Sequence, residues 1–154
     1  MQKRFLGNTG IRVSEIAFGG VEIGMPYGIG VNGREDMIAE KDAIALLQAA
    51  AAKGFNFFDT ARMYGVSENI MGKAFRHCRQ DIVLATKCRH FRNAEGVLSS
   101  DAEIKKLIHT SIRESLSALQ TDYIDVYMLH QADKEILDRQ VIADEMLRLK
   151  KPVW

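Results

Sequence analysis

Short apolar runs alternate with longer amphipathic stretches along most of this chain. The segments 55–58, 82–87 and 123–130 are nearly continuous apolar runs, as expected of parallel strands buried on both faces. A shorter run at 16–18 has the same character. Helical periodicity fills the intervals between these runs. Strands and helices that alternate at this spacing predict parallel βαβ units with right-handed crossovers.

Local signals place the helices between these strands. The segment 42–53 predicts a helix that ends at Gly54, where a residue able to adopt positive φ is expected. Ser67 is predicted to cap the second helix, and a capping box that begins at Ser100 opens the third. A last helical region covers about 135–150. The residues expected to face the core are Ile44, Leu47, Ala51, Ile70, Met71, Ala74, Phe75, Ile104, Leu107, Ile108, Ile112, Leu116 and Leu119.

The N-terminal region differs from these repeating units. Residues 3–13 predict a small hairpin with glycines in its turn. Residues 21–36 predict a glycine-rich loop that does not match the dinucleotide or P-loop fingerprints. We therefore interpret that loop as a flexible wall over a pocket and not as a phosphate cradle. No linker of low complexity divides the chain, so residues 1–154 are interpreted as one domain.

Composition and charge exclude several classes of function. The 20 acidic and 21 basic residues nearly balance, and no basic cluster indicates a nucleic-acid or membrane surface. No apolar stretch approaches the ~20 residues that span a bilayer, and the N-terminus lacks the apolar core of a signal peptide. The 2 cysteines are too few for a disulfide framework. We therefore expect a cytoplasmic protein that binds neither nucleic acid nor membrane.

Polar side chains stand where three of the predicted strands end. Asp59, Lys87 and His130 each end one apolar run, and Tyr64 follows in the loop after Asp59. Side chains alternate between the two faces of a strand, so the three can share one face. The carboxyl ends of parallel strands meet at one edge, which carries the active site in barrel folds. The sequence therefore predicts that these four side chains converge.

This set of groups suits proton transfer to an oxygen that gains negative charge. The ammonium of Lys87 would favour the phenolate form of Tyr64, so that its proton is easier to give up. Asp59 would pair with Lys87 and limit the cost of burying that charge. His130 would orient a substrate carbonyl by hydrogen bonding. The prediction is a general-acid site for a carbonyl that receives hydride.

Each of these residues also has a purely structural interpretation. A lysine–carboxylate pair at strand ends is often structural, and a lone histidine there is usually a satisfied surface or core group. Tyr64 could be an aromatic residue of a turn. The coincidence at three successive strand ends favours chemistry. Nearby, Arg89, His90 and Arg92 are interpreted as a solvated basic loop, with contact to an anionic substrate group as the alternative.

Possible metal ligands lie too far apart to form one site. His77 and Cys78 precede the 82–87 strand, whereas Cys88 and His90 follow it. At ~3.3 Å per residue, the strand separates the two pairs. The sequence therefore predicts no metal site.

With these residues in this order, the chain resembles the aldo-keto reductase family. The resemblance covers nearly the whole chain. The segments that carry it are 6–14 (LGNTGIRVS), 17–20 (AFGG), 57–61 (FFDTA), 64–68 (YGVSE), 85–87 (ATK), 122–125 (DYID) and 129–130 (LH).

The resemblance implies a fold, a reaction and a cofactor. The implied fold is a (β/α)8 TIM barrel opened by an N-terminal β-hairpin, here truncated to about four βα units, since a complete barrel typically needs ~250 residues. The implied reaction is NADPH-dependent reduction of an aldehyde or ketone, or its reverse on an alcohol or sugar. Asp59, Tyr64, Lys87 and His130 correspond to the catalytic tetrad, with Gly20 and Asp59 at cofactor-binding positions. The loops that hold the cofactor's pyrophosphate, adenosine phosphate and nicotinamide amide follow later strands, which are absent from this sequence.

A half barrel leaves two strand edges and one apolar face uncovered. We therefore expect self-association, pairing with a complementary half barrel, or rearrangement into a small open sheet. The main functional hypothesis is a reductase that is active through such association. The alternatives are a non-catalytic half-barrel remnant that binds a partner chain or small ligand, and a flavodoxin-like binding module, which no phosphate-binding loop supports.

Overall fold

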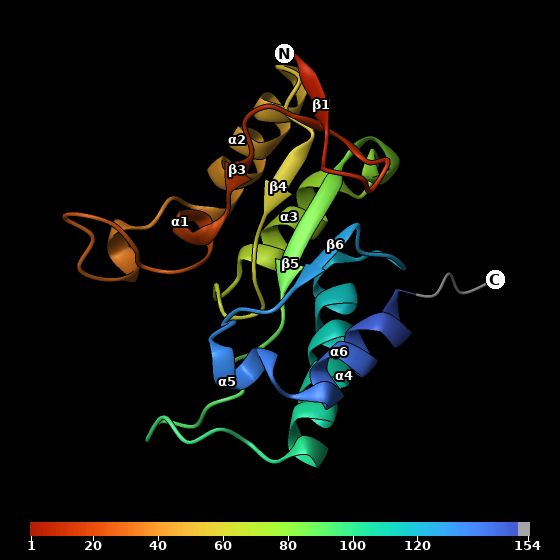
Figure 1. Cartoon of the computed structure of the whole chain (residues 1–154). Helices are drawn as coiled ribbons and strands as arrows, with labels where there is room; N and C mark the ends of the chain where they lie inside the picture. The colour runs from red at the N-terminus through yellow and green to blue at the C-terminus, as the bar shows by residue number, and fades with distance from the viewer. Residues whose placement is uncertain (151–154) are drawn as a thin grey trace.

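The computed structural model describes residues 1–150, which form two β-sheets (Figure 1). β1 (Lys3–Phe5) and β2 (Arg12–Ser14) form the predicted antiparallel hairpin. The second sheet is wholly parallel, in the order β3-β4-β5-β6. Its strands are β3 (Phe18–Gly19), β4 (Phe57–Asp59), β5 (Val83–Lys87) and β6 (Val126–Met128). This topology confirms the predicted α/β class with parallel βαβ units.

Helices connect the parallel strands. They are α1 (Val21–Gly24), α2 (Glu40–Ala52), α3 (Ser67–Phe75), α4 (Asp101–Leu119), α5 (Lys134–Leu137) and α6 (Gln140–Leu149), with 3-10 turns η1 (Arg34–Asp36) and η2 (Arg79–Asp81). As predicted, α2 is followed by Gly54 with φ +93°, and Ser100 forms a capping box at the start of α4. No helix in the described residues is long and apolar enough to cross a membrane.

One face of the parallel sheet packs against α2, α3 and α4 (Figure 1). Phe58 of β4 and Leu84 of β5 are fully buried in this layer, and the ring of Phe58 lies 4.5 Å from that of Phe75. Each such side chain contributes roughly 1.5–3 kcal/mol by its burial. A second apolar cluster packs α5 and α6 against α4. It consists of Cys88, Phe91, Ile104, Ile108, Ile136 and Ile142.

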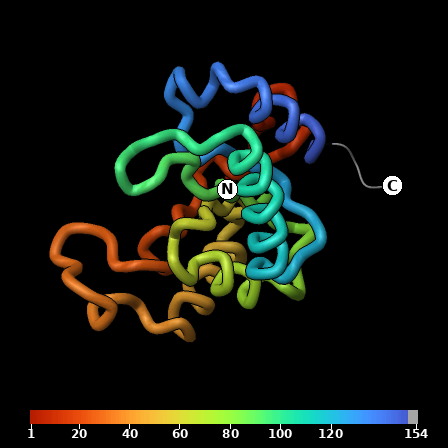
Figure 2. Tube along the Cα trace, turned by 90° about the horizontal axis from the view of Figure 1, so that it is seen from below, coloured from red at the N-terminus to blue at the C-terminus, as the bar shows by residue number. Residues whose placement is uncertain are grey.

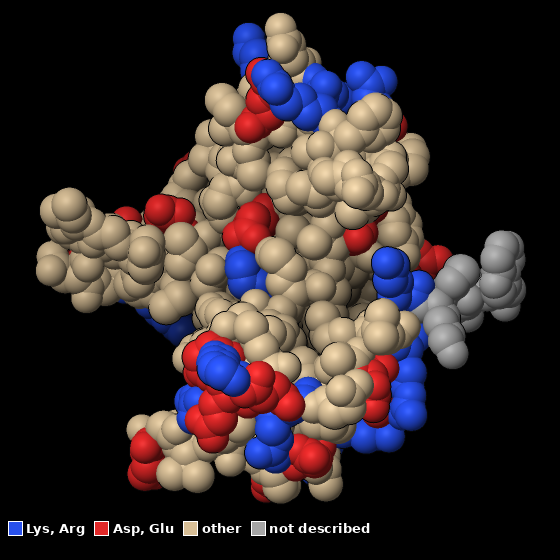
Figure 3. Space-filling view, in the orientation of Figure 1, with Lys and Arg blue, Asp and Glu red and all other residues tan. Residues whose placement is uncertain are grey.

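The other face of the sheet carries the polar strand ends. Ala85 pairs with Val126 and Lys87 with Met128, so the side chains of these four residues share one face. Val126 and Met128 are only partly buried. Figure 3, drawn in the orientation of Figure 1, shows a broad uncharged surface with acidic and basic atoms near its centre. An apolar face of this kind marks an interaction or ligand surface.

The N-terminal strand and loop differ from the sequence prediction. Ile16 is 59% exposed, and the strand predicted at 16–18 begins only at Phe18, because the preceding backbone still follows the hairpin through a bond from Glu15 N–H to the Gln2 carbonyl. The predicted loop at 21–36 contains α1 and η1. Figures 1 and 2 show residues 25–39 (orange) projecting from the body of the molecule.

Two helix predictions were wrong in detail. Ser67 is not the cap of α3: that position is Val66, and the buried Ser67 hydroxyl accepts a hydrogen bond from Thr60 Oγ1 at 2.8 Å. The single helix predicted at 135–150 is divided into α5 and α6 by the extended backbone of Arg139. Within α4, Leu107, Ile112 and Leu116 are only partly buried.

Candidate active site

Lys87 is the centre of a polar cluster at the C-terminal ends of the strands. Its Nζ donates hydrogen bonds to the two carboxylate oxygens of Asp59, at 2.7 and 2.8 Å, and to the carbonyl of Thr60 at 3.0 Å. The hydroxyl oxygen of Tyr64 lies 3.5 Å from the same nitrogen. The ring of His130 meets that of Tyr64 edge to face, with centroids 5.5 Å apart. The structure thus brings together the four side chains on which the sequence prediction rests.

The loop that carries Tyr64 is fixed by close backbone contact with α1. The N–H of Val66 donates to the carbonyl of Gly24 at 2.9 Å. A Cβ added at Gly24 would lie 2.0 Å from the Tyr64 carbonyl, and one added at Gly65 would lie 2.1 Å from the Gly24 carbonyl. Gly65 also has φ +55°, which other residues rarely adopt. Both glycines are therefore needed to place Tyr64.

A buried carboxylate ties the same loop to β5. Glu68 is 1% exposed, accepts a hydrogen bond from Thr86 Oγ1 at 2.7 Å and pairs with the guanidinium of Arg62. Thr86 directly precedes Lys87, so this network joins the two parts of the cluster. Glu68 has no predicted role beyond its place in the 64–68 segment. A charged residue in the first turn of a helix carries no local signal that it is buried.

His130 lies between two aromatic neighbours. Its ring centroid is 4.6 Å from that of His90 and 5.5 Å from that of Tyr64. Its Nδ1 is buried and has no hydrogen-bond partner in the described residues. Burial, and then the nearby His90 and Lys87, lower the pKa of His130 below its usual value. The imidazole is therefore neutral near pH 7 and can donate one N–H and accept at the other nitrogen.

The two arginines of the basic loop after β5 form ion pairs at the protein surface. Arg89 pairs with Glu114 of α4 at 2.8 Å. Arg92 pairs with Asp133 at 3.0 Å and with Glu135 at 2.6 Å. The reason is that α4 and the start of α5 place carboxylates beside the loop. Neither guanidinium is free to hold an anion.

Gly20 lies at the end of β3, beside the cluster. It is buried, and its N–H donates to the carbonyl of Asp59 at 2.8 Å. A Cβ at this position would lie 2.5 Å from Met71 Cε and 2.7 Å from Ser67 Oγ, so the glycine lets β3 approach α3 closely. The role of Gly20 and Asp59 in cofactor binding stays a prediction.

The remaining polar residues near these strands have structural partners. Arg79 pairs with Asp125 at 2.7 Å, and the hydroxyl of Tyr127 donates to the carbonyl of Ile108. Cys88 is fully buried, which raises the pKa of its thiol. Among residues 1–150, no group of three His, Cys, Asp or Glu side chains is arranged to hold a metal ion.

Comparison with known proteins shows which proteins this chain resembles in sequence and in structure. A family model described as "Aldo/keto reductase family" matches residues 15–151. The chain is 36% identical over 156 residues to L-galactose dehydrogenase of Arabidopsis thaliana, a match that covers 98% of this chain and 44% of that protein. An aldo-keto reductase of Bacillus halodurans in its holo form is 34% identical, with a TM-score of 0.74 over 97% of this chain and 46% of its own. An aldo-keto reductase of Klebsiella pneumoniae, solved in complex with NADPH, is 27% identical, with a TM-score of 0.62 over 90% of this chain and 42% of its own.

The chain therefore spans less than half the length of each of these three relatives. The superposition confirms the predicted fold, since the described residues match about half of a TIM-type barrel.

Proposed function

The chain belongs to the aldo/keto reductase family, and from this premise we propose that it carries the proton-donating part of an NADPH-dependent carbonyl reductase. The observation that carries the proposal is the position of Lys87 Nζ, bonded to Asp59 and 3.5 Å from the hydroxyl of Tyr64. The substrate class is a small aldehyde or ketone, or a sugar-type alcohol in the reverse direction.

In the proposed mechanism Tyr64 is the general acid. Its hydroxyl donates a proton to the carbonyl oxygen of the substrate, which gains negative charge as the carbon is reduced. The ammonium of Lys87 stabilises the phenolate that Tyr64 leaves behind, and Asp59 holds Lys87 in place. A positioned acid of this kind contributes about 10²–10⁴-fold to the rate.

His130 would orient the carbonyl rather than protonate it. Its lowered pKa keeps the imidazole neutral near pH 7, so that one ring nitrogen donates a hydrogen bond to the substrate oxygen. Its contact with the Tyr64 ring places it beside the proton donor.

The described residues fit the end of NADPH that donates the hydride better than they fit its phosphate groups. When bound, the cofactor supplies the hydride. The strand ends offer the acid and the polar side chains that this chemistry needs, with Gly20 and Asp59 proposed at the border of the cofactor site. The arginines near this edge already pair with carboxylates: Arg62 with Glu68, Arg89 with Glu114, and Arg92 with Asp133 and Glu135. We therefore assign the phosphate groups to residues outside this half of the barrel.

A second candidate is a half barrel that binds a partner chain without catalysis. It is favoured by the share of the relatives that the chain covers, 44% for the Arabidopsis enzyme. The test is a titration of the 154-residue chain with NADPH, followed by nicotinamide fluorescence and then by reduction of a panel of aldehydes. Saturable binding with turnover supports the reductase. No binding at millimolar cofactor supports the second candidate.

A further inference from the structure

His90 and His130 come from neighbouring strands and meet at the C-terminal edge of the sheet. Lys87 of β5 pairs with Met128 of β6, and the N–H of Cys88 donates to the Met128 carbonyl at 3.0 Å. His90 and His130 follow shortly after these paired residues. Their ring centroids are 4.6 Å apart, and their planes are inclined at 81°. The contact adds a second imidazole to the candidate active site.

The backbone on either side of His90 is fixed. The N–H of Arg89 donates to the hydroxyl of Ser111 on α4 at 3.1 Å. On the other side, Phe91 is 2% exposed, and its carbonyl accepts a hydrogen bond from the N–H of Ser99 at 2.8 Å. The freedom that His90 retains lies in its side-chain torsions, the second of which is broad in histidine.

The two ring nitrogens of His130 have different surroundings. Nδ1 is buried and has no hydrogen-bond partner in residues 1–150, whereas Nε2 is unbonded there but is not buried. A buried polar atom that stays unpaired costs about 1–3 kcal/mol, and the large majority of such atoms have a partner. A partner for Nδ1 is therefore expected among the side chains around the ring.

Three polar side chains near the His130 ring are not available as donors to Nδ1. Lys87 directs its N–H groups to both carboxylate oxygens of Asp59 and to the carbonyl of Thr60. The carboxylate of Asp59 has no proton to donate. The hydroxyl of Tyr64 lies 3.5 Å from Lys87 Nζ, and the proposed mechanism gives its proton to the substrate.

His90 has a ring N–H group that is not in use. Within residues 1–150 the rings of His77 and His109 each bond to another side chain, whereas the ring of His90 bonds to none. A direct N–H···N bond of ~2.9 Å places two imidazole centroids about 5 Å apart. At 4.6 Å the rings of His90 and His130 are already close enough, so rotation of the His90 ring would complete the bond.

We propose that His90 is a positioning residue whose ring N–H donates to Nδ1 of His130. A neutral imidazole carries one proton, so an accepting Nδ1 leaves that proton on Nε2. The Nε2–H group then lies on the unburied side of the ring, where a substrate carbonyl would bind. The use of this group rests on the proposed function, whereas the bond between the two rings needs neither cofactor nor substrate.

The direction of this one bond decides what His130 can do. If Nδ1–H of His130 donated to His90 instead, Nε2 would be a bare acceptor and could not donate to a carbonyl oxygen. Burial, and then the nearby His90, lower the pKa of His130. An N–H group of His90 directed at Nδ1 acts in the same sense, because it opposes protonation of that atom.

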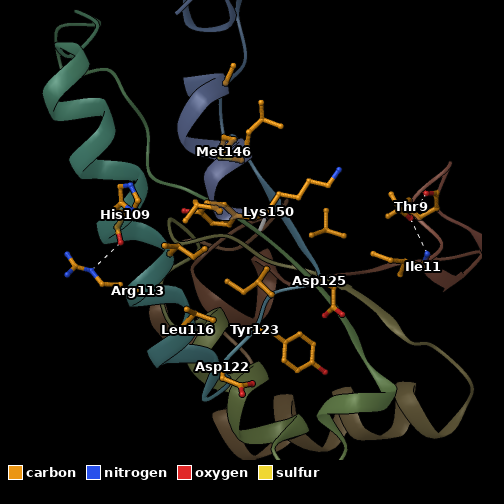
Figure 4. Close-up of a pocket in the computed structure, with 18 residues that line it drawn as sticks. Thr9, Ile11, His109, Arg113, Leu116, Asp122, Tyr123, Asp125, Met146 and Lys150 are labelled. Carbon is orange, nitrogen blue, oxygen red and sulfur yellow. Dashed lines mark hydrogen bonds between the residues drawn. The ribbon is translucent and has the colours of Figure 1, made fainter. Parts of the chain in front are cut away.

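A ligand in the large groove of the chain would not supply the missing partner. The groove has a volume of about 1540 Å³ and is lined by residues of the hairpin turn, α4, β6 and α6 (Figure 4). Neither His90 nor His130 is among the residues that line it. A molecule bound there would leave Nδ1 unpaired, which again favours His90.

The test is ¹⁵N NMR of the histidine rings in the 154-residue chain without cofactor. At about pH 8, above the usual histidine pKa, the protonated and bare ring nitrogens of a neutral imidazole have well-separated shifts. We expect the proton of His130 on Nε2. We also expect a scalar coupling between its Nδ1 and a ring nitrogen of His90, transmitted through the hydrogen bond.

Variants at position 90 separate the donor from the packing of the ring. His90→Phe keeps an aromatic ring but removes the N–H, so the population of the Nδ1–H form of His130 should rise about fivefold, the factor that a typical hydrogen bond supplies. His90→Gln has an N–H donor and should reverse most of this rise. His77→Phe, at a histidine on the other side of β5, is the matched control and should leave His130 unchanged.

Kinetics of the assembled, cofactor-binding protein distinguish this inference from the proposed function. His90→Phe should lower kcat and kcat/KM together by about fivefold, because the bond from Nε2–H to the carbonyl oxygen matters in the transition state. His90→Gln should recover most of the loss. If the NMR results hold but no carbonyl is reduced, the proposed function fails and the bond between the two rings stands.

Four results would overturn the inference. They are a proton on Nδ1 of His130 in the unmodified chain, no coupling between the two rings, equal effects of His90→Phe and His77→Phe on His130, and a His90→Gln variant that behaves like His90→Phe. The first two need no variant, so they decide the matter even if a substituted chain fails to fold.

Discussion

The ammonium of Lys87 lies 3.5 Å from the hydroxyl oxygen of Tyr64, although 23 positions of sequence separate the two residues. The nitrogen also stands 4.9 Å from the centre of the Tyr64 ring. Positive charge is thus held where a phenolate would form, at a site that Asp59 stabilises from the other side. The arrangement exists in the described half barrel without any contribution from a second half.

Tyr64→Phe should abolish reduction while leaving the fold intact. The loss should be about 10²–10⁴-fold in kcat/KM of the assembled, cofactor-binding protein, because the proton donor is removed. The unfolding free energy should change by less than about 0.5 kcal/mol, since the hydroxyl makes only one long hydrogen bond in the described residues. Steady-state kinetics and urea unfolding measure the two effects. The control is Tyr27→Phe, which removes a hydroxyl from a residue that is 56% exposed. Full turnover by Tyr64→Phe would contradict the assignment of Tyr64 as the general acid.

Glu68→Ala should destabilise the chain strongly. The substitution leaves Arg62, whose side chain is 14% exposed, and Thr86 without their shared partner. Breaking a buried pair in this way costs about 3–5 kcal/mol, measurable by urea unfolding. The matched control is Asp138→Ala, which removes the exposed pair of Lys134 and Asp138 and should cost at most about 1 kcal/mol. Similar losses in both variants would contradict the buried role of Glu68.

Gly24→Ala should displace the loop that carries Tyr64. The added Cβ would lie 2.0 Å from the Tyr64 carbonyl, so the backbone itself must move. We expect a loss of about 1–3 kcal/mol in unfolding free energy and faster exchange of the Val66 amide, which bonds to Gly24. Gly19→Ala is the control, because a Cβ there meets nothing within 4 Å. An unchanged Val66 exchange rate in Gly24→Ala would mean that the loop is fixed by other contacts.

His130 should titrate below the usual histidine pKa of 6.5, because its burial opposes protonation. His90→Ala should raise the His130 midpoint only in part, since burial is the larger cause. NMR of the histidine rings, titrated from about pH 4 to 8, measures the His130 midpoint in the unmodified chain and in His90→Ala. A His130 midpoint above 6.5 in the unmodified chain would contradict the structure.

The same depressed pKa fixes the direction of the pH dependence of stability. Below pH 6.5 the unfolded chain binds more protons at His130 than the folded chain does. Its contribution to the unfolding free energy is therefore fully present above 6.5, declines as the pH falls below that value, and is lost once the pH has passed the folded-state pKa.

The strand ends were predictable from the sequence because their signals are local. A parallel strand buried on both faces leaves a continuous apolar run, and Asp59 and Lys87 stand where two such runs stop. The alternation of side chains then places them on one face. No contact beyond the strand itself is needed for this inference.

The network behind them was not predictable, because its signals are ambiguous or distant. Ser67 suits a helix cap as well as the buried hydrogen bond with Thr60 that it makes. Glu68 meets Thr86 from 18 positions away, and Arg89 meets Glu114 from 25. A sequence pattern records the chemistry of each residue but not which distant partner the fold brings to it.

The hydrogen-bond and backbone contacts that hold Tyr64 in position come from residues 24–87, through the Gly24 backbone, the Glu68 carboxylate and the Lys87 ammonium. The ring of His130, from the same half of the barrel, packs against the Tyr64 ring edge to face. The proton-donating site that we propose therefore lies within this half of the barrel. Under the proposed function, exchanging the second half for that of another relative would alter which cofactor and substrate reach Tyr64 and would leave these contacts unchanged. In this architecture, specificity can diversify while the acid stays constant.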